Sequence, residues 1–371
     1  MSGSDHLISD MVERLFGDHV TGATLEAAES GGFQQDLWDV VEEHGLASML
    51  SASDDDSELG WHQVFMVMRA AGAHCLPLPL GESIAASFLL HRSGLGAQAG
   101  RIGLASGSDL RLHQTKGGWS ASGLLRRVPW GRNLASVVSS LDHEGEGRIV
   151  VVPVAACAVM AGANLVGEPR DELVVEDVPV AVARCAQKPM GTEGFAPDIA
   201  RQLGALLRAG QMAGAIGAIL DTALTYAGER RQFARAIGGF QAVQHQLAVL
   251  AEESAAAAVA AEQAFRSVDS GRDHGFAIAV AKIRVGEAAG RVAAIAHQVL
   301  GAMGFAREHR LHHATRRLWA WRGEFGAECF WAGRLAQMVI PLGAAGLSPF
   351  VTVAQSGAKS EETAPSSPRQ S

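Results

Sequence analysis

The residues best suited to chemistry in this chain lie in the run RRQFARAIGGFQAVQ, residues 230–244. Arg230 and Phe233 are three residues apart, so a helical end would place the guanidinium and the ring on one side. The Gly-Gly pair that follows breaks the run, and a new helix is predicted from about Gln241. An arginine beside an exposed ring and a helix N-terminus suits an anion such as a pyrophosphate, with the ring free to stack. The alternative is a plain helix–turn–helix corner with solvated arginines.

A second candidate lies in HQVLGAMGF, residues 297–305. Gln298 offers both a hydrogen-bond donor and an acceptor, and Gly301 at a predicted helix end lets a ligand or a backbone come close. A plain helix C-cap gives the same glycine spacing. Three histidines follow within residues 309–313, but neighbouring histidines on a helix do not face one ligand. No metal site is therefore predicted.

Composition bounds the class of protein. The chain has 371 residues, of which 48% are hydrophobic and 19% charged, enough to bury sizeable cores. A formal net charge of −8 argues against a sequence-independent grip on nucleic acid. The sequence has no run of 18 or more apolar residues and no basic, apolar leader at its N-terminus, so neither a membrane span nor a signal peptide is predicted. We expect a cytoplasmic protein.

Periodicity divides the chain into helices, strands and helices again. Helical periodicity predicts an N-terminal helical domain over residues 1–98, and short β-rich runs predict a small β domain over 99–190. Long helical segments over 196–346 predict a four-helix bundle, and residues 347–371 have little to bury and are predicted to be disordered. The fold class is thus α+β. Close contact between helices is predicted from glycines at helical spacing: Gly210, Gly214, Gly217, Gly286 and Gly290.

These segments and their order resemble the acyl-CoA dehydrogenase family over about residues 5–345. The family carries an R-x-x-F-G … F-Q-x-V-Q segment and then Q-x-x-G-G-x-G in its C-terminal bundle. The resemblance implies that the adenosine–pyrophosphate half of an FAD bound to a neighbouring chain would contact Arg230, Phe233, Gln241, Gln298 and Gly301. Ala234 and Ala302 stand where the family prefers glycine, and both are small.

The family's reaction removes an α-proton from an acyl-CoA with a glutamate, commonly in a Y-E-G-T segment. Matching TRRLWAWRGEFGAECF to that segment places Arg322 or Phe325 on the glutamate, and an earlier alternative position falls near Gly204. The nearest acid is Glu324, one residue or about 100° of helix rotation out of register. Glu324 is therefore either a working base or a carboxylate paired with Arg322 or Arg317.

The β domain also departs from the family. Its T-E-P-x-x-G-S-D segment, which helps hold the flavin ring, corresponds to IGLASGSD at residues 102–109, and no W-[IV]-T-N segment is visible. The residues that would hold the adenosine–pyrophosphate end of FAD, here called the clamp (Arg230, Phe233, Gln241, Gln298 and Gly301), match the family, whereas the segments that would hold the flavin ring do not. This combination resembles one chain of the α2β2 bacterial members that act on steroid side-chain CoA thioesters.

That resemblance implies a heterotetramer in which this chain completes the FAD site and a partner supplies the glutamate. Two alternatives stay open, a homomeric acyl-CoA dehydrogenase using Glu324 and a non-enzymatic scaffold subunit. The family also implies an acyl-CoA substrate and an electron-transferring flavoprotein as acceptor.

Overall fold

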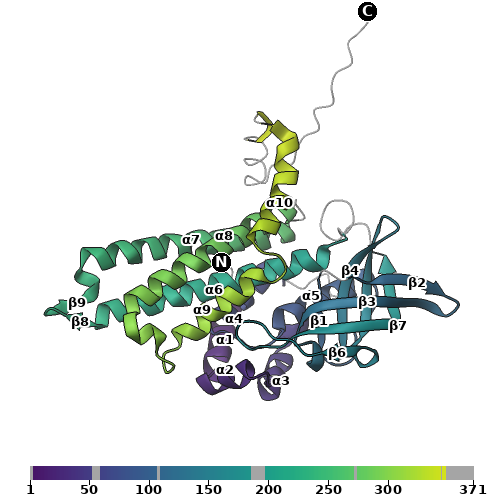
Figure 1. Cartoon of the computed structure of the whole chain (residues 1–371), viewed down its shortest axis with the longest axis horizontal. Helices are drawn as coiled ribbons and strands as arrows, with labels where there is room; N and C mark the ends of the chain where they lie inside the picture. Colours follow the sequence, from purple (N-terminus) through teal and green to yellow (C-terminus); the bar gives the residue numbers. More distant parts are fainter. Residues whose placement is uncertain are drawn as a thin grey trace, which may run out of the picture.

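The structure is a computed structural model that describes residues 3–51, 59–106, 109–184, 197–270, 274–343 and 345–347. Figure 1 shows an elongated molecule with a β-sheet unit at one end and a helical bundle at the other. A smaller group of N-terminal helices packs beside both. The predicted α+β class, in the order helices, sheet, helices, is confirmed. Residues 348–371 of the tail predicted to be disordered lie outside the described residues.

The N-terminal unit consists of α1 (Gly3–His19), α2 (Gly22–Glu29), α3 (Gln35–Glu43), the short 3-10 helix η1 (Leu46–Ser48), α4 (Trp61–Ala73) and α5 (Leu80–Ser93). Local signals start some of these helices, such as the Thr21 side chain that accepts from the Thr24 N–H at 3.2 Å. The start of α4 is different. Its first two N–H groups donate to the carboxylate of Asp269, far along the chain, at 2.7 and 2.8 Å. One bundle residue thus caps an N-terminal helix.

The β-sheet unit contains β1 (Ile102–Leu104), β2 (Arg111–Thr115), β3 (Gly118–Pro129), β4 (Ser136–His143), β5 (Glu146–Pro153), β6 (Ala158–Met160) and β7 (Arg170–Arg184). The strand order is β1-β4-β5-β7-β3-β2, with β6 also paired to β7. Among the described strands of this sheet, β1 and β4 form the one parallel pair. The long β7 holds the sheet together, because one part of it pairs with β3 and its final residues pair with β5.

The C-terminal bundle contains α6 (Ile199–Glu229), α7 (Gln241–Asp269), α8 (His274–Leu300), α9 (Leu311–Gly323) and α10 (Glu328–Val339), with η6 (Ile340–Leu342) after it. The fourth predicted long helix is therefore two helices. The break lies at Phe325 (φ 55°) and Gly326 (φ 106°), whose left-handed backbone cannot continue a helix. As a result α10 turns away from the bundle and projects from the body (Figure 1).

Glycine brings the bundle against the N-terminal helices. A Cβ at Gly214 would overlap the carbonyl oxygen of Arg69 in α4, and one at Gly72 would overlap the carbonyl oxygen of Gln211 in α6. Among the predicted glycines, Gly210 and Gly286 also face close neighbours, whereas Gly217 meets nothing within 4 Å. One hydrophobic cluster runs through both helical units, and a second fills the sheet.

The central helix α6 is long and apolar enough to cross a membrane by composition alone. However, 83% of its most apolar window is buried inside the protein, as in the core helix of a bundle. Among the described residues it is the one helix that passes this test.

Candidate functional site

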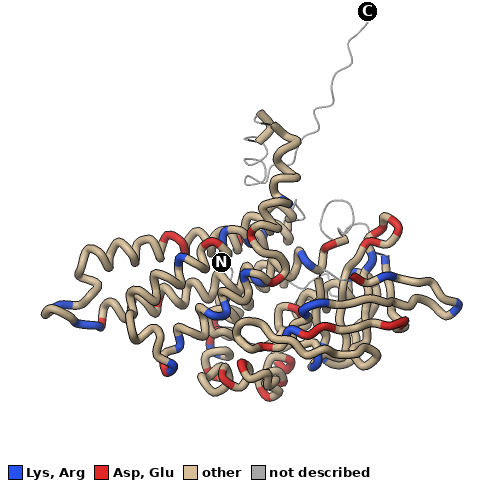
Figure 2. Tube along the Cα trace, in the orientation of Figure 1, with Lys and Arg blue, Asp and Glu red and all other residues tan. Residues whose placement is uncertain are grey.

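The bundle topology brings the two predicted binding segments to one end of the molecule. Helix α6 ends there and α7 begins there, while α8 ends at Leu300 next to η5 (Gly301–Phe305). Figure 1 shows both connections at the end opposite the sheet, and Figure 2 shows Lys/Arg colouring on the one between α6 and α7. The candidate residues are Arg230, Phe233, Gln241, Gln298 and Gly301, and all of them are exposed.

The link between α6 and α7 is a hairpin, not the helical end expected from the spacing of Arg230 and Phe233. It consists of β8 (Arg231–Gln232) and β9 (Arg235–Ala236). The two turn residues, Phe233 and Ala234, both have positive φ, 50° and 63°, as a tight two-residue hairpin turn requires. The turn lifts the Phe233 ring into solvent, where it is 87% exposed.

Aromatic and cationic groups meet beside this turn. The rings of Phe233 and Phe240 are 6.1 Å apart, edge to face, and the Arg235 guanidinium lies 3.9 Å over the Phe240 ring. Gln241 is the first residue of the 29-residue helix α7. Its free N–H groups and the nearby arginines make this a positive helix end that suits a phosphate.

The second segment lies at the C-terminal end of α8. Gly301 has φ 56°, and a Cβ there would meet nothing within 4 Å, so the backbone is open to an approaching group. A cavity of about 360 Å³ is lined by Gln298 with His297, Phe305 and Trp319. The rings of His297 and Phe305 stack at 4.6 Å. These aromatic neighbours of Gln298 were not predicted, because only folding brings Trp319 of α9 next to α8.

Of the three histidines that follow, His313 is part of a cluster of ion pairs. His313 Nδ1 lies 2.6 Å from Glu29 of α2, and Arg316 and Arg317 pair with the same carboxylate at 2.8 and 2.9 Å. Burial opposes the charge of Glu29, but the His313 hydrogen bond and the cations lower its pKa to about 2. No metal-binding group of three His, Cys, Asp or Glu side chains occurs among the described residues.

Glu324 lies at the junction of the bundle, the sheet and the N-terminal helices, and is only 6% exposed. Its Oε1 accepts from Arg170 Nε of β7 at 2.7 Å, and its Oε2 accepts from Arg208 Nε of α6 at 2.7 Å. Burial opposes its ionisation, but the two guanidinium groups outweigh burial and lower the pKa of Glu324 to about 2. A carboxylate with both oxygens engaged and so low a pKa does not suit a general base at neutral pH.

The pairing expected for Glu324 is wrong in its partners. Arg322 pairs with Glu328, and Arg317 pairs with Glu29 and Glu168. The ion pairs nevertheless extend past Glu324 on both sides, to Glu82 of α5 through Arg208 and to Glu168 through Arg170. The result is a buried network that joins all three units.

The surroundings of Glu324 are filled by this chain's own side chains. The Phe325 ring lies against Gly204, where a Cβ would overlap its ring carbons, and the Arg208 guanidinium lies 5.6 Å from the centre of the same ring. Gly204 is the residue near which the sequence placed the family's alternative position for the catalytic glutamate. The cavity left between this turn and the sheet is only about 160 Å³, and three arginines line it: Arg126, Arg127 and Arg201.

FAD therefore fits one end of this chain and not the other. The exposed arginines, the aromatic rings, the start of α7 and Gly301 suit an adenosine–pyrophosphate. The small arginine-lined cavity beside Glu324 does not suit a tricyclic flavin ring. Of the G-S-D match, Asp109 is described, and its carboxylate pairs with Arg126 at 3.0 Å.

Known proteins are similar to this chain in sequence over its C-terminal part. Residues 182–327 match the family model "Acyl-CoA dehydrogenase, C-terminal domain". Glutaryl-CoA dehydrogenase of Desulfococcus multivorans is 42% identical over 101 residues, which cover 26% of each chain. Acyl-CoA dehydrogenase FadE34 of Mycobacterium tuberculosis is 33% identical over 177 residues, which cover 45% of this chain and 25% of FadE34. The matched part is thus about a quarter of each of these relatives.

Solved structures resemble the whole chain. The ChsE4–ChsE5 complex of Mycobacterium tuberculosis matches with a TM-score of 0.80 at 19% identity, covering 92% of this chain and 98% of that one. A variant of the Tcur3481–Tcur3483 steroid ACAD matches with a TM-score of 0.81 at 21% identity, covering 92% and 99%. PigA, solved with FAD and proline, matches with a TM-score of 0.78 at 17% identity, covering 91% and 98%.

The C-terminal part of the chain, residues 182–327, is similar to the C-terminal domain of the acyl-CoA dehydrogenases, and nearly the whole chain has the fold of the solved structures named above.

Proposed function

We propose that this chain is a subunit of an FAD-dependent acyl-CoA dehydrogenase that holds the adenosine–pyrophosphate end of FAD for a partner subunit. The partner holds the flavin ring and supplies the glutamate that removes the α-proton. The observation that carries the proposal is the contrast between the two ends of this chain. One end offers exposed Arg230 and Phe233 at a helix start, and the other is closed by Glu324, Phe325 and their arginines.

In this proposal the residues of this chain bind and orient. Arg230 and Arg235 face the pyrophosphate charge, Phe233 offers a ring for stacking, and Gly301 leaves room for the cofactor backbone. FAD itself takes up the hydride when bound. An electron-transferring flavoprotein as the next acceptor, a steroid side-chain thioester as substrate and a cytoplasmic location are further parts of the proposal. The acceptor and the substrate rest on the family resemblance and on the two neighbouring complexes.

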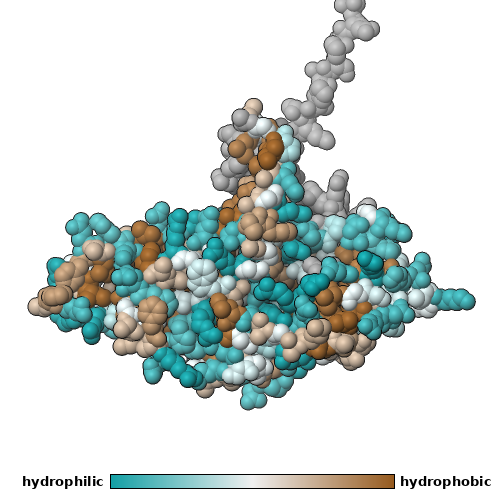
Figure 3. Space-filling view, viewed as in Figure 1, coloured by the Kyte–Doolittle hydropathy of each residue, from teal (hydrophilic) through white to brown (hydrophobic). Residues whose placement is uncertain are grey.

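Exposed apolar surface supports a partner subunit. Val249 and Val259 of α7 are 42% and 61% exposed, and Ile340 after the projecting α10 is 74% exposed. Figure 3 shows brown apolar surface near the tip of that projection. Apolar side chains on a projecting helix are typical of a contact with another chain.

Two alternatives remain for the experiment to decide. A homomeric enzyme would use Glu324 as the base, which requires the ion pairs to Arg170 and Arg208 to open. A scaffold subunit would bind no flavin, and its exposed Arg230 and Phe233 would have no ligand.

The test is to purify the chain alone and co-expressed with a family member that carries an intact Y-E-G segment. We expect the lone chain to be colourless, and the pair to show flavin absorbance with equal amounts of the two chains by light scattering. Flavin and acyl-CoA turnover in the lone chain would overturn the proposal. A stable pair without flavin would support the scaffold.

The clamp is tested within the co-expressed pair. Arg230→Ala together with Phe233→Ala should lower flavin occupancy about tenfold or more, since each removes a contact of about 1 kcal/mol or more to the cofactor. The matched control is Arg266→Ala, an exposed arginine on α7 that pairs with Glu262 at 2.8 Å. Equal flavin content in the clamp variant and the control would contradict the assignment.

A further inference from the structure

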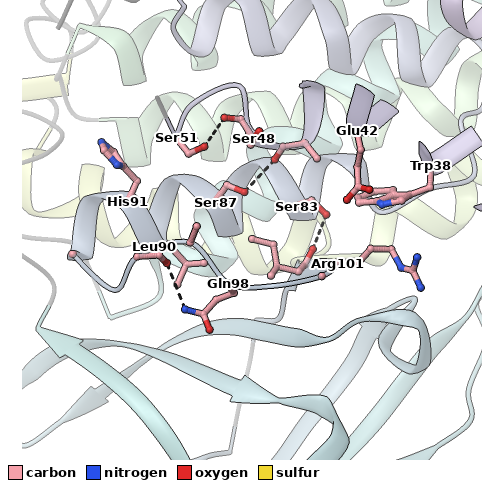
Figure 4. Close-up of a pocket in the computed structure, with 16 residues that line it drawn as sticks. Trp38, Glu42, Ser48, Ser51, Ser83, Ser87, Leu90, His91, Gln98 and Arg101 are labelled. Carbon is pink, nitrogen blue, oxygen red and sulfur yellow. Dashed lines mark hydrogen bonds between the residues drawn. The ribbon is translucent and has the colours of Figure 1, made fainter. Parts of the chain in front are cut away.

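A separate cavity lies between the N-terminal helices and the first strand of the sheet (Figure 4). Its volume is about 560 Å³, and its walls come from α3, η1, α5 and the segment 94–102. Small-molecule sites commonly have volumes of about 300–1,000 Å³. None of its lining residues belongs to the clamp or to the turn around Glu324.

Three serines in the wall have oriented hydroxyl groups. Ser83 donates to the carbonyl of Ile102 at 2.6 Å, Ser87 to the carbonyl of Ala47 at 3.1 Å, and Ser51 to the carbonyl of Ser48 at 2.6 Å. Figure 4 shows the bonds of Ser83 and Ser87 linking α5 with the segments on either side of it, and the bond of Ser51 within the segment around η1. Because each hydroxyl hydrogen is already donated, the serine oxygens are left with lone pairs that can accept. The wall therefore favours a ligand that donates.

Trp38 supplies a hydrogen-bond donor, whereas the serine oxygens are acceptors. Its side chain lines the cavity and is only 1% exposed, and its indole N–H has no hydrogen-bond acceptor among the described residues. Buried donors in folded proteins are nearly always paired, so this indole N–H is a donor that a bound ligand can pair. Tryptophan is also a large apolar surface on which a ring or chain can pack.

The charges around the cavity are directed elsewhere. The Arg101 guanidinium donates to the carbonyl of Asn133 at 2.8 Å and to Gln35 Oε1 at 2.7 Å, and Figure 4 shows it pointing away from the serines. His91 points outward in the same view. Among the described lining residues Glu42 is the one carboxylate, and it is exposed. An anionic ligand would thus find no free cation inside.

We propose that this cavity binds an uncharged, largely apolar small molecule that carries a hydroxyl group. The ligand hydroxyl donates its hydrogen to a serine oxygen, and its oxygen accepts the N–H of Trp38. Leu90, Ile102 and the Trp38 ring contact the apolar remainder. This site is independent of the FAD assignment, because it uses none of the same residues.

The test is a calorimetric titration of the full chain, in the oligomer in which it is purified, with three ring compounds of similar shape. These are 2-naphthol, naphthalene and naphthalene-2-sulfonate. We expect one 2-naphthol per chain, bound roughly tenfold more tightly than naphthalene, because only 2-naphthol pairs the indole N–H and a serine oxygen. The sulfonate should bind most weakly. Equal affinity for all three, or tightest binding of the sulfonate, would overturn the proposal.

Two variants locate the binding. Trp38→Phe keeps a ring and removes the N–H, so the affinity for 2-naphthol should fall to about that for naphthalene, whose own affinity should barely change. Ser87→Leu fills the cavity and should abolish the binding of both. Val159→Leu, on the exposed strand β6 of the sheet, is the control that should leave all affinities as they are. Undiminished 2-naphthol binding in folded Ser87→Leu would place the ligand elsewhere and sink the proposal.

Discussion

At the scale of single residues, Glu324 is held as a charged partner of two arginines. Glu324→Gln keeps the shape and removes the charge that Arg170 and Arg208 face. We expect the free energy of unfolding at neutral pH to fall by about 3–5 kcal/mol, as when one member of a buried ion pair is removed. Urea unfolding followed by circular dichroism measures this change. The exposed Glu262→Gln, whose partner is Arg266, is the control and should cost less than about 1 kcal/mol.

The same carboxylate makes stability depend on pH with a definite sign. The pKa of Glu324 in the folded chain is about 2, below its ordinary value of 4.5. The contribution of the Glu324 carboxylate to the free energy of unfolding is therefore complete above about pH 4.5 and is lost as the pH falls toward 2. The difference in stability between wild type and Glu324→Gln should narrow as the pH falls through this window. A difference that stays constant down to the acid end would contradict the ion-pair role.

Ala234 is strained by its position in the hairpin turn. Its φ of 63° lies in the left-handed region, which costs a residue with a Cβ about 1 kcal/mol relative to glycine. Ala234→Gly should therefore raise the stability of the hairpin, and proteolysis at the exposed Arg231 and Arg235 should slow. Ala236→Gly, on β9 next to the turn, is the comparison and should speed proteolysis. Faster cleavage in Ala234→Gly would show that the alanine is not strained.

At the scale of elements, two glycines of α6 distinguish the effect of helix packing on the free energy of unfolding from the effect of helix propensity. Gly214→Ala puts a methyl group against the backbone of α4 at Arg69 and should lower the free energy of unfolding by about 2 kcal/mol or more. Gly217→Ala meets open space and should raise it by about 0.5–1 kcal/mol, because alanine is the better helix former. Urea unfolding of the two variants measures both changes. Equal changes in the free energy of unfolding would mean that the contact with α4 does not limit the size of the side chain at position 214.

The elements show what the sequence could predict. The helices, the longer strands and the close contacts at Gly210, Gly214 and Gly286 follow from local periodicity, and the start of α7 at Gln241 follows from the Gly-Gly break. The hairpin at Phe233 was missed, because two non-glycine residues with positive φ carry no turn signature. The partners of Glu324 were also missed, since Arg170 lies 154 residues away and only the assembled fold brings it within reach. Neither of two short strands shows an alternating pattern, because β2 has one apolar residue, Leu112, and β6 is only three residues long.

At the scale of the whole molecule, charged groups connect units that hydrophobic contacts join only in part. One hydrophobic cluster runs through the helical units and reaches one face of the sheet, while the other face has a cluster of its own. Arg170 at the start of β7 contacts Glu324 beyond α9 and Glu168 beside Arg317. This arginine is therefore the point at which the sheet is fixed to the bundle by charge.

Arg170→Met tests this connection with a side chain of similar length. In this variant Glu324 still pairs with Arg208, and Glu168 still pairs with Arg317. The start of β7 and the turn after α9 each lose the ion pair that joined them. We expect hydrogen exchange at both places to speed up by about tenfold or more, the effect of roughly 1.4 kcal/mol or more in local opening. Arg148→Met is the control, because its partner Glu146 lies on the same strand β5 and 2.7 Å away. Faster exchange confined to β7, with the turn unchanged, would show that the sheet and the bundle open independently and that the network does not couple them.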